Sequence, residues 1–370
     1  EDRIAIIEVG GTVGDIESQP FLEAIRQFRH EIGYQNSVLI HVTLVPYLKA
    51  SGELKTKPTQ QSVKALQGMG ISPDVIVCRT EVPLEDGIES KIALFCNVPE
   101  DHVLQNLDVE YLYEAPLAME KERLAHVVCE CLHLPCPEPQ LGDWKQMVDA
   151  LKNPTSEVTI ALVGKYIQLH DAYLSVMEAL KHGGIANRTK VTIKWVDSEF
   201  LKPEALDDTF AGVDGIIIPG GFGSRGTEGM ILAANYAREN KIPFLGICLG
   251  MQMAMVAFAR NVLGYADANS SELDPETTHP VVDLMPDQNG VENLGGTLRL
   301  GSYPCVLDKK SKAYSLYGTD MINERHRHRF EINNDYRDDF TSHGMMISGQ
   351  SPDGHIVEMI ELPDHPFYVG

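Results

Sequence analysis

Short apolar runs, several of which end in glycine, recur through the second half of the chain and constrain its fold more than any other feature. Helical patterns at 171–182 and 227–239 alternate with them. The runs read VTIALVG (158–164), KVTIKWV (190–196), DGIIIPGG (214–221) and IPFLGIC (242–248). Buried parallel strands are typically continuous apolar runs, and strand–helix alternation predicts a doubly wound sheet. Ligands of such a sheet bind beyond the carboxyl ends of its strands.

Cys248 lies at one of these strand ends, inside Gly-Ile-Cys-Leu-Gly (246–250). A free cysteine is often simply buried in a core. The flanking glycines instead favour a nucleophile elbow, a turn too sharp for larger residues. Such a turn places the sulfur near a helix amino end, which favours the thiolate. The five residues alone leave both interpretations open.

The loop PGGFGSRG (219–226) follows another strand of the same series. It is either a flexible connection or a loop whose backbone amides approach a ligand closely. Because a second strand-end turn lies in the same domain, we favour the catalytic interpretation. The natural oxyanion donors are the amide of Leu249 and one amide from Gly221–Phe222.

The first part of the chain shows a similar alternation. Helical patterns at 20–32 and 59–69 separate the apolar runs RIAIIEV (3–9), VLIHVTLV (38–45), DVIVCRT (74–80) and KIALFCNV (91–98). They predict a second parallel sheet with helices on both faces. The proline-rich stretch LPCPEP breaks this pattern. We therefore expect an α/β protein with one domain at 1–134, a linker at 135–156 and a second domain at 157–370.

Composition excludes several classes of function. A formal net charge of −22 over 370 residues argues against a nucleic-acid partner. No apolar stretch approaches the roughly 20 residues that cross a membrane. The seven cysteines are odd in number and lack metal-ligand spacing, which favours free thiols in a reducing cytoplasm.

The second domain resembles the class I glutamine amidotransferases through PGGFGSRGTEGM and GICLGMQ. NSSEL (269–273), LGGTLRLG (294–301) and ERHRHRFEINN (324–334) are similar to the glutaminase domain of the CTP synthases. The resemblance implies a flavodoxin-like fold in which Cys248 attacks the glutamine amide, passes through a thioester and releases ammonia. The residues that match glutamine-binding positions are Gly221, Leu249, Gly250, Met251, Gln252, Glu272 and Arg329. An acidic and a forked basic side chain suit the two charged groups of an amino acid, although both could be surface charges.

A cysteine nucleophile needs a histidine base. In the family this base belongs to a His-Pro-Glu motif after a strand that matches the one starting at Phe367, and the chain stops at Gly370. His365 precedes that strand and matches a non-catalytic histidine, whereas His326 and His328 are expected to shape the loop that carries Arg329. We therefore expect this segment to lack a complete triad.

The first domain resembles the P-loop NTPase-like amidoligase domain of the same family through GGTVGDIE (10–17), IHVTLVPYLKASGEL (40–54), KTKPTQ (55–60) and KIALFCNVPE (91–100). Taken alone, GGTVGDIE is better explained as an acidic solvated loop, and lysines such as those of KTKPTQ usually serve only solubility. Cations beside a helix amino end nevertheless suit an anion. The resemblance implies a magnesium ligand at Glu8 and an adenine contact of ATP at Leu107, Asp108 and Val109. It implies a UTP or CTP site at Asp15, Ile16, Glu17, Lys55, Thr56, Lys57, Pro58, Thr59, Gln60 and Lys91.

The family begins with a phosphate-binding loop that ends in Gly-Lys, and no G-x-x-x-x-G-K-[ST] occurs in this chain. We therefore expect a segment cut from a longer protein at both ends. The resemblance implies amination of UTP to CTP with Mg²⁺, ATP as co-substrate, GTP as an activator contacting Arg225, and inhibition by CTP. It also implies a cytoplasmic homotetramer that can form filaments. The alternatives are a glutaminase serving another synthetase and a non-catalytic nucleotide-binding or assembly fragment.

Overall fold

The structure is a computed structural model that describes residues 4–284 and 299–370. The chain divides into two compact units, Glu1–Asp149 and Ala150–Gly370. Helix α6 (Gly142–Lys152) crosses this boundary, inside the segment predicted as a linker. The Trp144 indole donates to the carbonyl of Tyr113 at 2.7 Å, so the start of α6 is fastened to the first unit.

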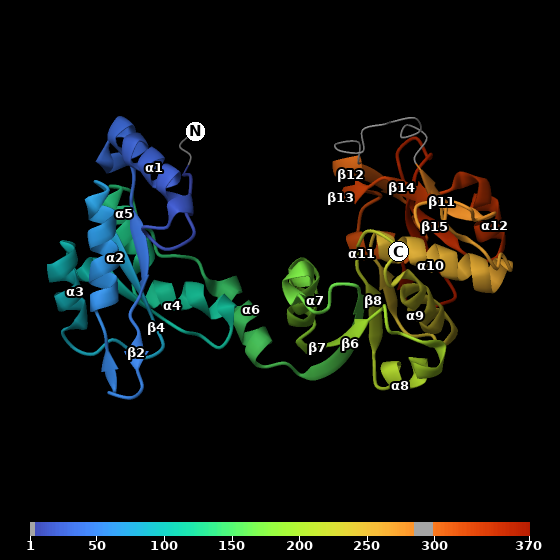
Figure 1. Cartoon of the computed structure of the whole chain (residues 1–370), viewed down its shortest axis with the longest axis horizontal. Helices are drawn as coiled ribbons and strands as arrows, with labels where there is room; N and C mark the ends of the chain where they lie inside the picture. The colour runs from blue at the N-terminus through green and yellow to red at the C-terminus, as the bar shows by residue number, and fades with distance from the viewer. Residues whose placement is uncertain (1–3, 285–298) are drawn as a thin grey trace. The chain divides into compact units, whose positions relative to one another are not determined.

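The first unit is built on a parallel sheet in the order β1-β4-β5. These strands are β1 (Ile40–Leu44), β4 (Val75–Thr80) and β5 (Val103–Leu107), and the small hairpin is β2 (Tyr47–Leu48) with β3 (Glu53–Leu54). The helices are α1 (Gln19–Ile32), α2 (Lys57–Gly68), α3 (Ile88–Cys96), α4 (Ala115–Lys121) and α5 (Leu124–Cys131). Figure 1 shows them around the sheet.

Strand β4 has helices on both of its faces, as the sequence predicts. Ile76 and Cys78 pack in one cluster with residues of α2 and α3. Val75 and Val77 pack in another cluster with Val127 of α5. Successive side chains of a strand point to opposite faces, so this alternation buries β4 on both sides.

The predicted strand at 3–9 is wrong for the residues that the structure describes. Residues 4–10 have no regular structure, and Ile4, Ile6 and Ile7 are 75%, 94% and 70% exposed. A strand requires a hydrogen-bonded neighbour, and this segment pairs with none of the described strands of the unit. An apolar run alone does not supply that partner.

A second correction concerns KIALFCNV (91–98): residues 91–96 belong to helix α3 instead of a strand. Ile92 and Cys96 are fully buried, whereas Leu94 and Phe95 are 79% and 61% exposed. The buried positions are four residues apart, which is helical spacing. Short apolar runs do not distinguish a strand from a buried helix. The sequence reading also missed β5.

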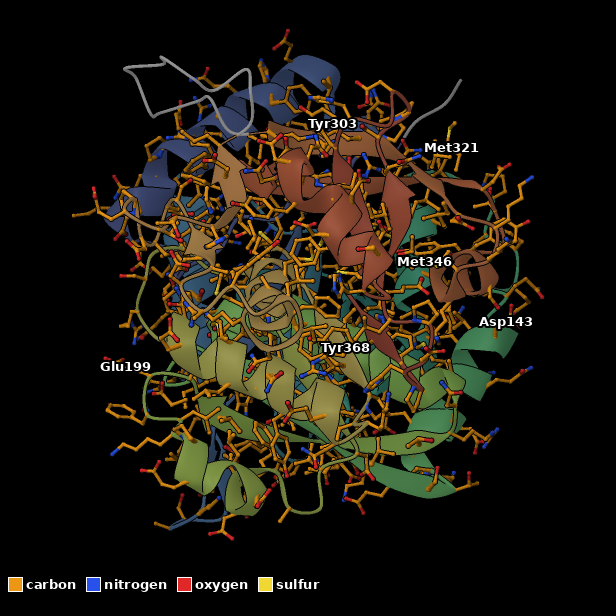
Figure 2. The ribbon with its side chains drawn as sticks, turned by 90° about the vertical axis from the view of Figure 1, so that its right-hand side faces the viewer. Asp143, Glu199, Tyr303, Met321, Met346 and Tyr368 are labelled. Carbon is orange, nitrogen blue, oxygen red and sulfur yellow. The ribbon has the colours of Figure 1, made fainter. Side chains whose placement is uncertain are left out.

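The second unit contains a nine-stranded sheet in the order β13-β12-β15-β16-β17-β9-β8-β6-β7. Its parallel strands are β6 (Ser156–Gly164), β7 (Thr189–Asp197), β8 (Gly215–Ile218), β9 (Phe244–Gly246) and β17 (Tyr368–Val369). Its antiparallel strands are β12 (Arg299–Leu307), β13 (Met321–His328), β15 (Met346–Gln350) and β16 (Val357–Glu361). In Figure 2, Tyr303, Met346 and Tyr368 follow this sheet from its antiparallel end to β17.

Helices cover both faces of the parallel strands in the second unit. Leu162 and Ile217 pack toward α7, whereas Val163, Ile216 and Ile218 share a cluster with α9 and α10. The helices are α7 (Leu174–Ala186), α8 (Leu206–Phe210), α9 (Thr227–Glu239), α10 (Leu249–Phe258), α11 (Lys312–Tyr317) and α12 (Arg337–Ser342). A small second sheet contains β10 (Asn269–Ser270), β11 (Pro280–Leu284) and β14 (Phe330–Ile332). The predicted doubly wound, mainly parallel fold is confirmed.

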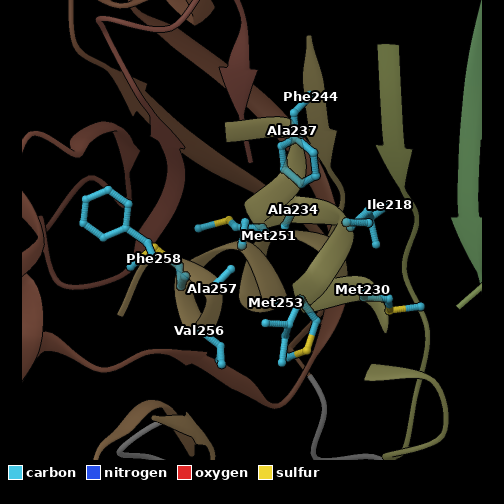
Figure 3. Close-up of a cluster of buried hydrophobic side chains, with 14 of the residues drawn as sticks. Ile218, Met230, Ala234, Ala237, Phe244, Met251, Met253, Val256, Ala257 and Phe258 are labelled. Atoms are coloured by element: carbon cyan, nitrogen blue, oxygen red, sulfur yellow. The ribbon is translucent and has the colours of Figure 1, made fainter. Parts of the chain in front are cut away.

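Helix α10 forms the centre of this unit's core. All of its residues except Gln252 are buried and apolar or glycine, which is typical of a helix in a core. Met251, Met253 and Phe258 pack there with Ile218 and Met230, as Figure 3 shows. Within the described ranges, no helix has both the length and the apolar character to span a membrane.

Candidate active site

The turn between β9 and α10 has the geometry of a nucleophile elbow. Cys248 adopts φ 53° and ψ −108°, a left-handed backbone that non-glycine residues rarely take. A Cβ on Gly246 would lie 2.7 Å from the Gly250 carbonyl carbon, and one on Gly250 would collide with the Ile218 carbonyl oxygen. The strand and the helix therefore approach too closely for side chains, as the glycines predict.

The Cys248 side chain is exposed, whereas Cys78, Cys96 and Cys305 are buried. Cys248 lines a cavity of about 330 Å³. Ligand pockets span about 300–1,000 Å³, so this volume suits a small molecule. The other lining residues are Gly221, Phe222, Gln252, Glu272, Arg327, His328, Arg329 and Phe330. The interpretation of Cys248 as a sealed core cysteine is therefore wrong.

The electrostatics of the thiol differ from the sequence-based expectation. Desolvation by the surrounding protein is the main effect and raises the pKa of Cys248, and the Glu272 carboxylate raises it further. The backbone amide of Leu249 hydrogen-bonds to the cysteine and opposes this shift, but does not reverse it. The helix end therefore does not create a stable thiolate by itself, and the sulfur needs a base to ionise at neutral pH.

Two histidines bear on the search for that base. His365 is buried, and its ring nitrogens bond to the Ala237 carbonyl at 3.1 Å and the Phe367 amide at 3.2 Å. Both nitrogens are thus engaged in the backbone, which agrees with its predicted non-catalytic role. The strand that follows His365, β17, pairs in parallel with β9, the strand that leads into Cys248.

His328 lines the cavity, but it is tied to its own loop. Its Nδ1 lies 3.1 Å from the Phe330 carbonyl, and its Nε2 lies 3.1 Å from His326 Nδ1. Burial is the main cause that lowers the pKa of His328 to about 4, so the ring is neutral. Among the hydrogen bonds of the described residues, none joins a histidine to the Cys248 sulfur. His326 and His328 shape the loop that carries Arg329, as the sequence predicts.

The glycine loop at 219–226 lies directly against the elbow. A Cβ on Gly220 would be 3.5 Å from Cys248 Cβ, and one on Gly221 would be 3.4 Å from Leu249 Cδ2. The two strand ends singled out by the sequence therefore meet at one edge of the sheet. This arrangement brings the candidate oxyanion donors, the Leu249 amide and the Gly221–Phe222 amides, to the same side of the sheet as the sulfur.

The predicted glutamine-binding residues separate into two groups. Glu272, Gln252 and Arg329 line the cavity, so opposite charges face the space beside Cys248. Gln252 also donates to the Phe330 carbonyl at 2.9 Å, which joins α10 to β14. Gly250 and Met251 are buried in the core, so the structure assigns them a packing role.

The sequence did not predict several residues that lie in or beside the cavity. Arg327 and Phe330 line the cavity, and the Arg327 guanidinium lies 5.5 Å from the centre of the Phe222 ring. Lys165 lies next to the glycine loop and is only 3% exposed. Its signal was its place directly after the apolar run 158–164. Arg225, the predicted GTP contact, is bonded to Glu199 at 2.9 Å.

In the first unit, two groups of predicted residues lie at the carboxyl edge of the sheet. KTKPTQ forms the amino end of α2, which begins at Lys57, two residues earlier than predicted. Thr59 donates to the Leu44 carbonyl at 3.2 Å, where β1 ends. Leu107 ends β5, and the Asp108 amide donates to the Thr80 carbonyl at 3.0 Å at the end of β4.

The predicted nucleotide residues of the loop at 15–17 are not brought to that edge. Asp15 and the neighbouring Ile16 and Glu17 are exposed, and the Asp15 carboxylate accepts the Thr12 amide at 2.9 Å. Their loop packs through Val13 into the cluster of Leu22, Leu66 and Ile71. Leu66 lies in the last turn of α2, at the opposite end from KTKPTQ.

Glu8 and Lys91 are both exposed. No group of three His, Cys, Asp or Glu side chains within residues 4–284 and 299–370 could hold a metal ion. Mg²⁺ in proteins is commonly bound by one or two carboxylates, with waters and substrate phosphates as its other ligands, so Glu8 stays a predicted magnesium ligand. We assign no chemical step to that metal.

Two family models match the chain. Residues 1–134 match the CTP synthase N-terminus, and residues 168–370 match glutamine amidotransferase class-I. The CTP synthase of Ruminiclostridium cellulolyticum is 60% identical over 367 residues, which are 99% of this chain and 68% of that protein. The CTP synthase of Clostridium beijerinckii is 58% identical over 366 residues, again 99% of this chain and 68% of the relative.

A solved structure, described as Trypanosoma brucei CTPS glutaminase domain with bound acivicin, is also similar. It is 39% identical, with a TM-score of 0.54, and the match covers 57% of this chain and 83% of that one. The family models, the relatives that match 99% of this chain and the elbow geometry agree. The chain therefore belongs to the CTP synthase family of glutamine-hydrolysing ligases.

Proposed function

We propose that the second unit hydrolyses glutamine at Cys248 and that the ammonia aminates UTP to CTP at the expense of ATP. The observation that supports this is an exposed cysteine on a strained elbow, facing a cavity lined by one carboxylate, Glu272, and two guanidiniums, Arg327 and Arg329. Free glutamine carries an α-ammonium and an α-carboxylate, which match Glu272 and Arg329 in charge. Residues 1–134 match the CTP synthase N-terminus, which disfavours a glutaminase for another synthetase.

In the proposed reaction, Glu272 and Arg329 hold the amino-acid end of glutamine and present its side-chain amide to Cys248. The sulfur attacks the amide carbon once a base has taken the thiol proton, and the carbonyl oxygen becomes an oxyanion. The amides of Leu249 and Gly221–Phe222 stabilise that charge. Collapse of this intermediate breaks the carbon–nitrogen bond. The nitrogen takes the proton from the base and leaves as ammonia, and a thioester remains. Water then cleaves the thioester to glutamate and regenerates the thiol.

The nucleotide residues are proposed from the family resemblance. Lys55–Gln60 and Leu107–Val109 gain support from their common place at the carboxyl edge of β1, β4 and β5. The proposal for Lys91, Asp15–Glu17 and Glu8 rests on the resemblance alone. GTP activation through Arg225, CTP inhibition, a homotetramer and a cytoplasmic location are proposals on the same basis.

The test uses Cys248→Ala in the full-length protein, with either glutamine or ammonium chloride as nitrogen donor. Loss of the nucleophile should reduce CTP formation from glutamine at least about 10³-fold. Formation from ammonium chloride should stay within about twofold, because ammonia bypasses the thioester. Cys136→Ala is the control, since Cys136 is an exposed thiol outside the cavity. Equal loss with both donors, or glutamine-dependent synthesis by Cys248→Ala, would contradict the assignment.

A further inference from the structure

Lys165 is a buried lysine that the proposed reaction does not use. It directly follows the last residue of β6, at the sheet edge where Cys248 lies, and is 3% exposed. Burial is the main cause that lowers the pKa of its ammonium to about 8, and Arg225 lowers it further, whereas Glu272 raises it. Burying an ammonium is unfavourable unless it has partners. The partners of Lys165 therefore indicate why a lysine is placed here.

The glycine loop is folded around this one residue. Lys165 Nζ donates to the Phe222 carbonyl at 3.0 Å and also to the Gly223 carbonyl. The Lys165 carbonyl accepts from the Arg225 guanidinium at 2.8 Å. Gly221 lies against the lysine stem, since a Cβ there would be 3.6 Å from Lys165 Cε. The side chain thus holds the middle of the loop at Phe222 and Gly223, and the main chain holds its end at Arg225.

The backbone of Lys165 is itself fixed. The Tyr173 hydroxyl accepts the Lys165 amide at 3.0 Å and the Tyr166 amide at 3.2 Å. Tyr173 is 4% exposed and reaches these amides because Gly164 has no side chain; a Cβ there would lie 2.9 Å from Tyr173 Cζ. The Lys165 side chain therefore extends from a backbone that is held in place, unlike the side chain of a mobile surface lysine.

We propose that Lys165 is a positioning residue that orients the glycine loop so that its amides face the oxyanion formed at Cys248. This inference rests on the proposed glutaminase function. The ammonium turns two consecutive carbonyls of the loop toward itself, which fixes the peptide planes Phe222–Gly223 and Gly223–Ser224, directly after the Gly221–Phe222 peptide that carries a candidate donor amide. Without it those carbonyls would turn to water. Preorganised amides stabilise developing charge only while their direction is held.

A purely stabilising role predicts a different residue. An apolar side chain of similar length would fill the same space without the desolvation penalty of an ammonium. Lys165→Met should therefore preserve the fold but release the loop. Lys312→Met is the matched control, because Lys312 Nζ also donates to a backbone carbonyl, that of Pro363 at 3.2 Å, and Lys312 does not line the cavity.

The experiment measures glutamate release from glutamine by the full-length protein. Deleting one oxyanion donor lowers kcat by about 10²–10³, and we expect a displaced loop to lower it by roughly 10–100-fold. KM for glutamine should change less than about threefold, since Glu272 and Arg329 are untouched. Lys165→Arg should restore part of kcat by donating to the same carbonyls. Alkylation of Cys248 by iodoacetamide, which needs no oxyanion stabilisation, should keep its wild-type rate.

Each outcome decides between the roles. A kcat for Lys165→Met within threefold of wild type, at normal KM, overturns the proposal. So does a parallel loss of kcat, melting temperature and iodoacetamide reactivity, which would show that Lys165 only holds the unit together. Absence of glutamate release by the wild-type protein would instead refute the glutaminase assignment itself. The Lys312→Met control should match wild type in all three measurements.

Discussion

At the scale of single residues, the site depends on how closely the backbone of α10 approaches the strands. Gly250 touches the Ile218 carbonyl, and Gly246 lies against the backbone of Gly250. These contacts hold Cys248 in a left-handed conformation that is strained for any residue except glycine. The packing of the core, rather than the cysteine itself, therefore maintains the elbow.

Gly250→Ala should destabilise the second unit, because its Cβ would collide with the Ile218 carbonyl. Overpacking of a core typically lowers the free energy of unfolding by about 1–3 kcal/mol. Urea unfolding measures the change. Gly183→Ala is the control: it lies in α7 with nothing within 4 Å of an added Cβ, and should be neutral or slightly stabilising. Equal stability of Gly250→Ala and wild type would contradict this close approach.

At the scale of elements, the antiparallel end of the large sheet supports the cavity with buried charges. Arg299 of β12 forms two hydrogen bonds, at 2.9 and 2.6 Å, to Glu358 of β16. Their side chains are 8% and 3% exposed. His326 Nε2 of β13 lies 3.4 Å from the same carboxylate. The charges thus connect β12, β13 and β16, next to the loop that carries Arg329.

Glu358→Gln should leave the buried Arg299 guanidinium without its counter-charge. Removing one charge of a buried ion pair lowers the free energy of unfolding by about 3–5 kcal/mol, because the other charge stays buried without its partner. Asp320→Asn is the matched control. Asp320 forms an ion pair with Lys309 over an N–O distance of 3.8 Å, and both side chains are exposed. Such a surface pair contributes less than about 1 kcal/mol to stability. Comparable urea midpoints for the two variants would show that the buried pair is not structural.

His328, the last residue of β13, predicts that the stability of the protein depends on pH. His328 has a pKa of about 4 in the folded protein, below the ordinary value of 6.5, mainly through burial. Between these values the unfolded chain binds a proton that the folded chain does not, so stability is lost as the pH falls from 6.5 to 4. Each pKa unit corresponds to 1.36 kcal/mol, which gives a loss of about 2 kcal/mol from pH 7 to pH 5.

Urea unfolding at pH 7 and pH 5 tests this loss. His328→Gln should show a smaller difference between the two pH values than wild type. His355→Gln, a change of an exposed histidine in the same unit, should keep the wild-type difference. An identical pH dependence in all three proteins would mean that His328 does not contribute.

The sequence predicted the parts of the site that are encoded locally. Gly246 and Gly250 flank the cysteine in the chain, so the elbow was readable, and Arg329 and Glu272 were found through the family resemblance. Lys165 was not predicted as a site residue, because a lysine that follows a strand looks the same in the sequence whether it is buried or solvated. The prediction of a strand at 3–9 was wrong for a similar reason, because a strand must pair with another segment that can be distant in the sequence.

At the scale of the whole molecule, the chain has a proline-rich stretch shortly before the boundary between its two units. Residues 133–140 are exposed, and residues 134–141 have no regular structure. Helix α6 follows and is tied to the first unit by Trp144. The exposed stretch therefore lies within the first unit, between α5 and α6, rather than at the boundary between the units.

Limited proteolysis should therefore cut first at 134–141, since exposed irregular segments are the preferred cleavage sites. Mass spectrometry of the early fragments identifies the site. Trp144→Ala should add later cuts within α6, because that helix then loses its hydrogen bond to Tyr113. Early cleavage inside α9 or α10 would contradict the described packing.

The central claim is that Cys248 is the nucleophile of a glutamine pocket. The most direct measurement is peptide mapping of the full-length protein after treatment with an electrophilic analogue of glutamine. We predict one adduct, on Cys248 within residues 241–260, prevented by excess glutamine and strongly reduced in Arg329→Met. Modification of other cysteines in place of Cys248, or labelling that glutamine does not prevent, would contradict the account.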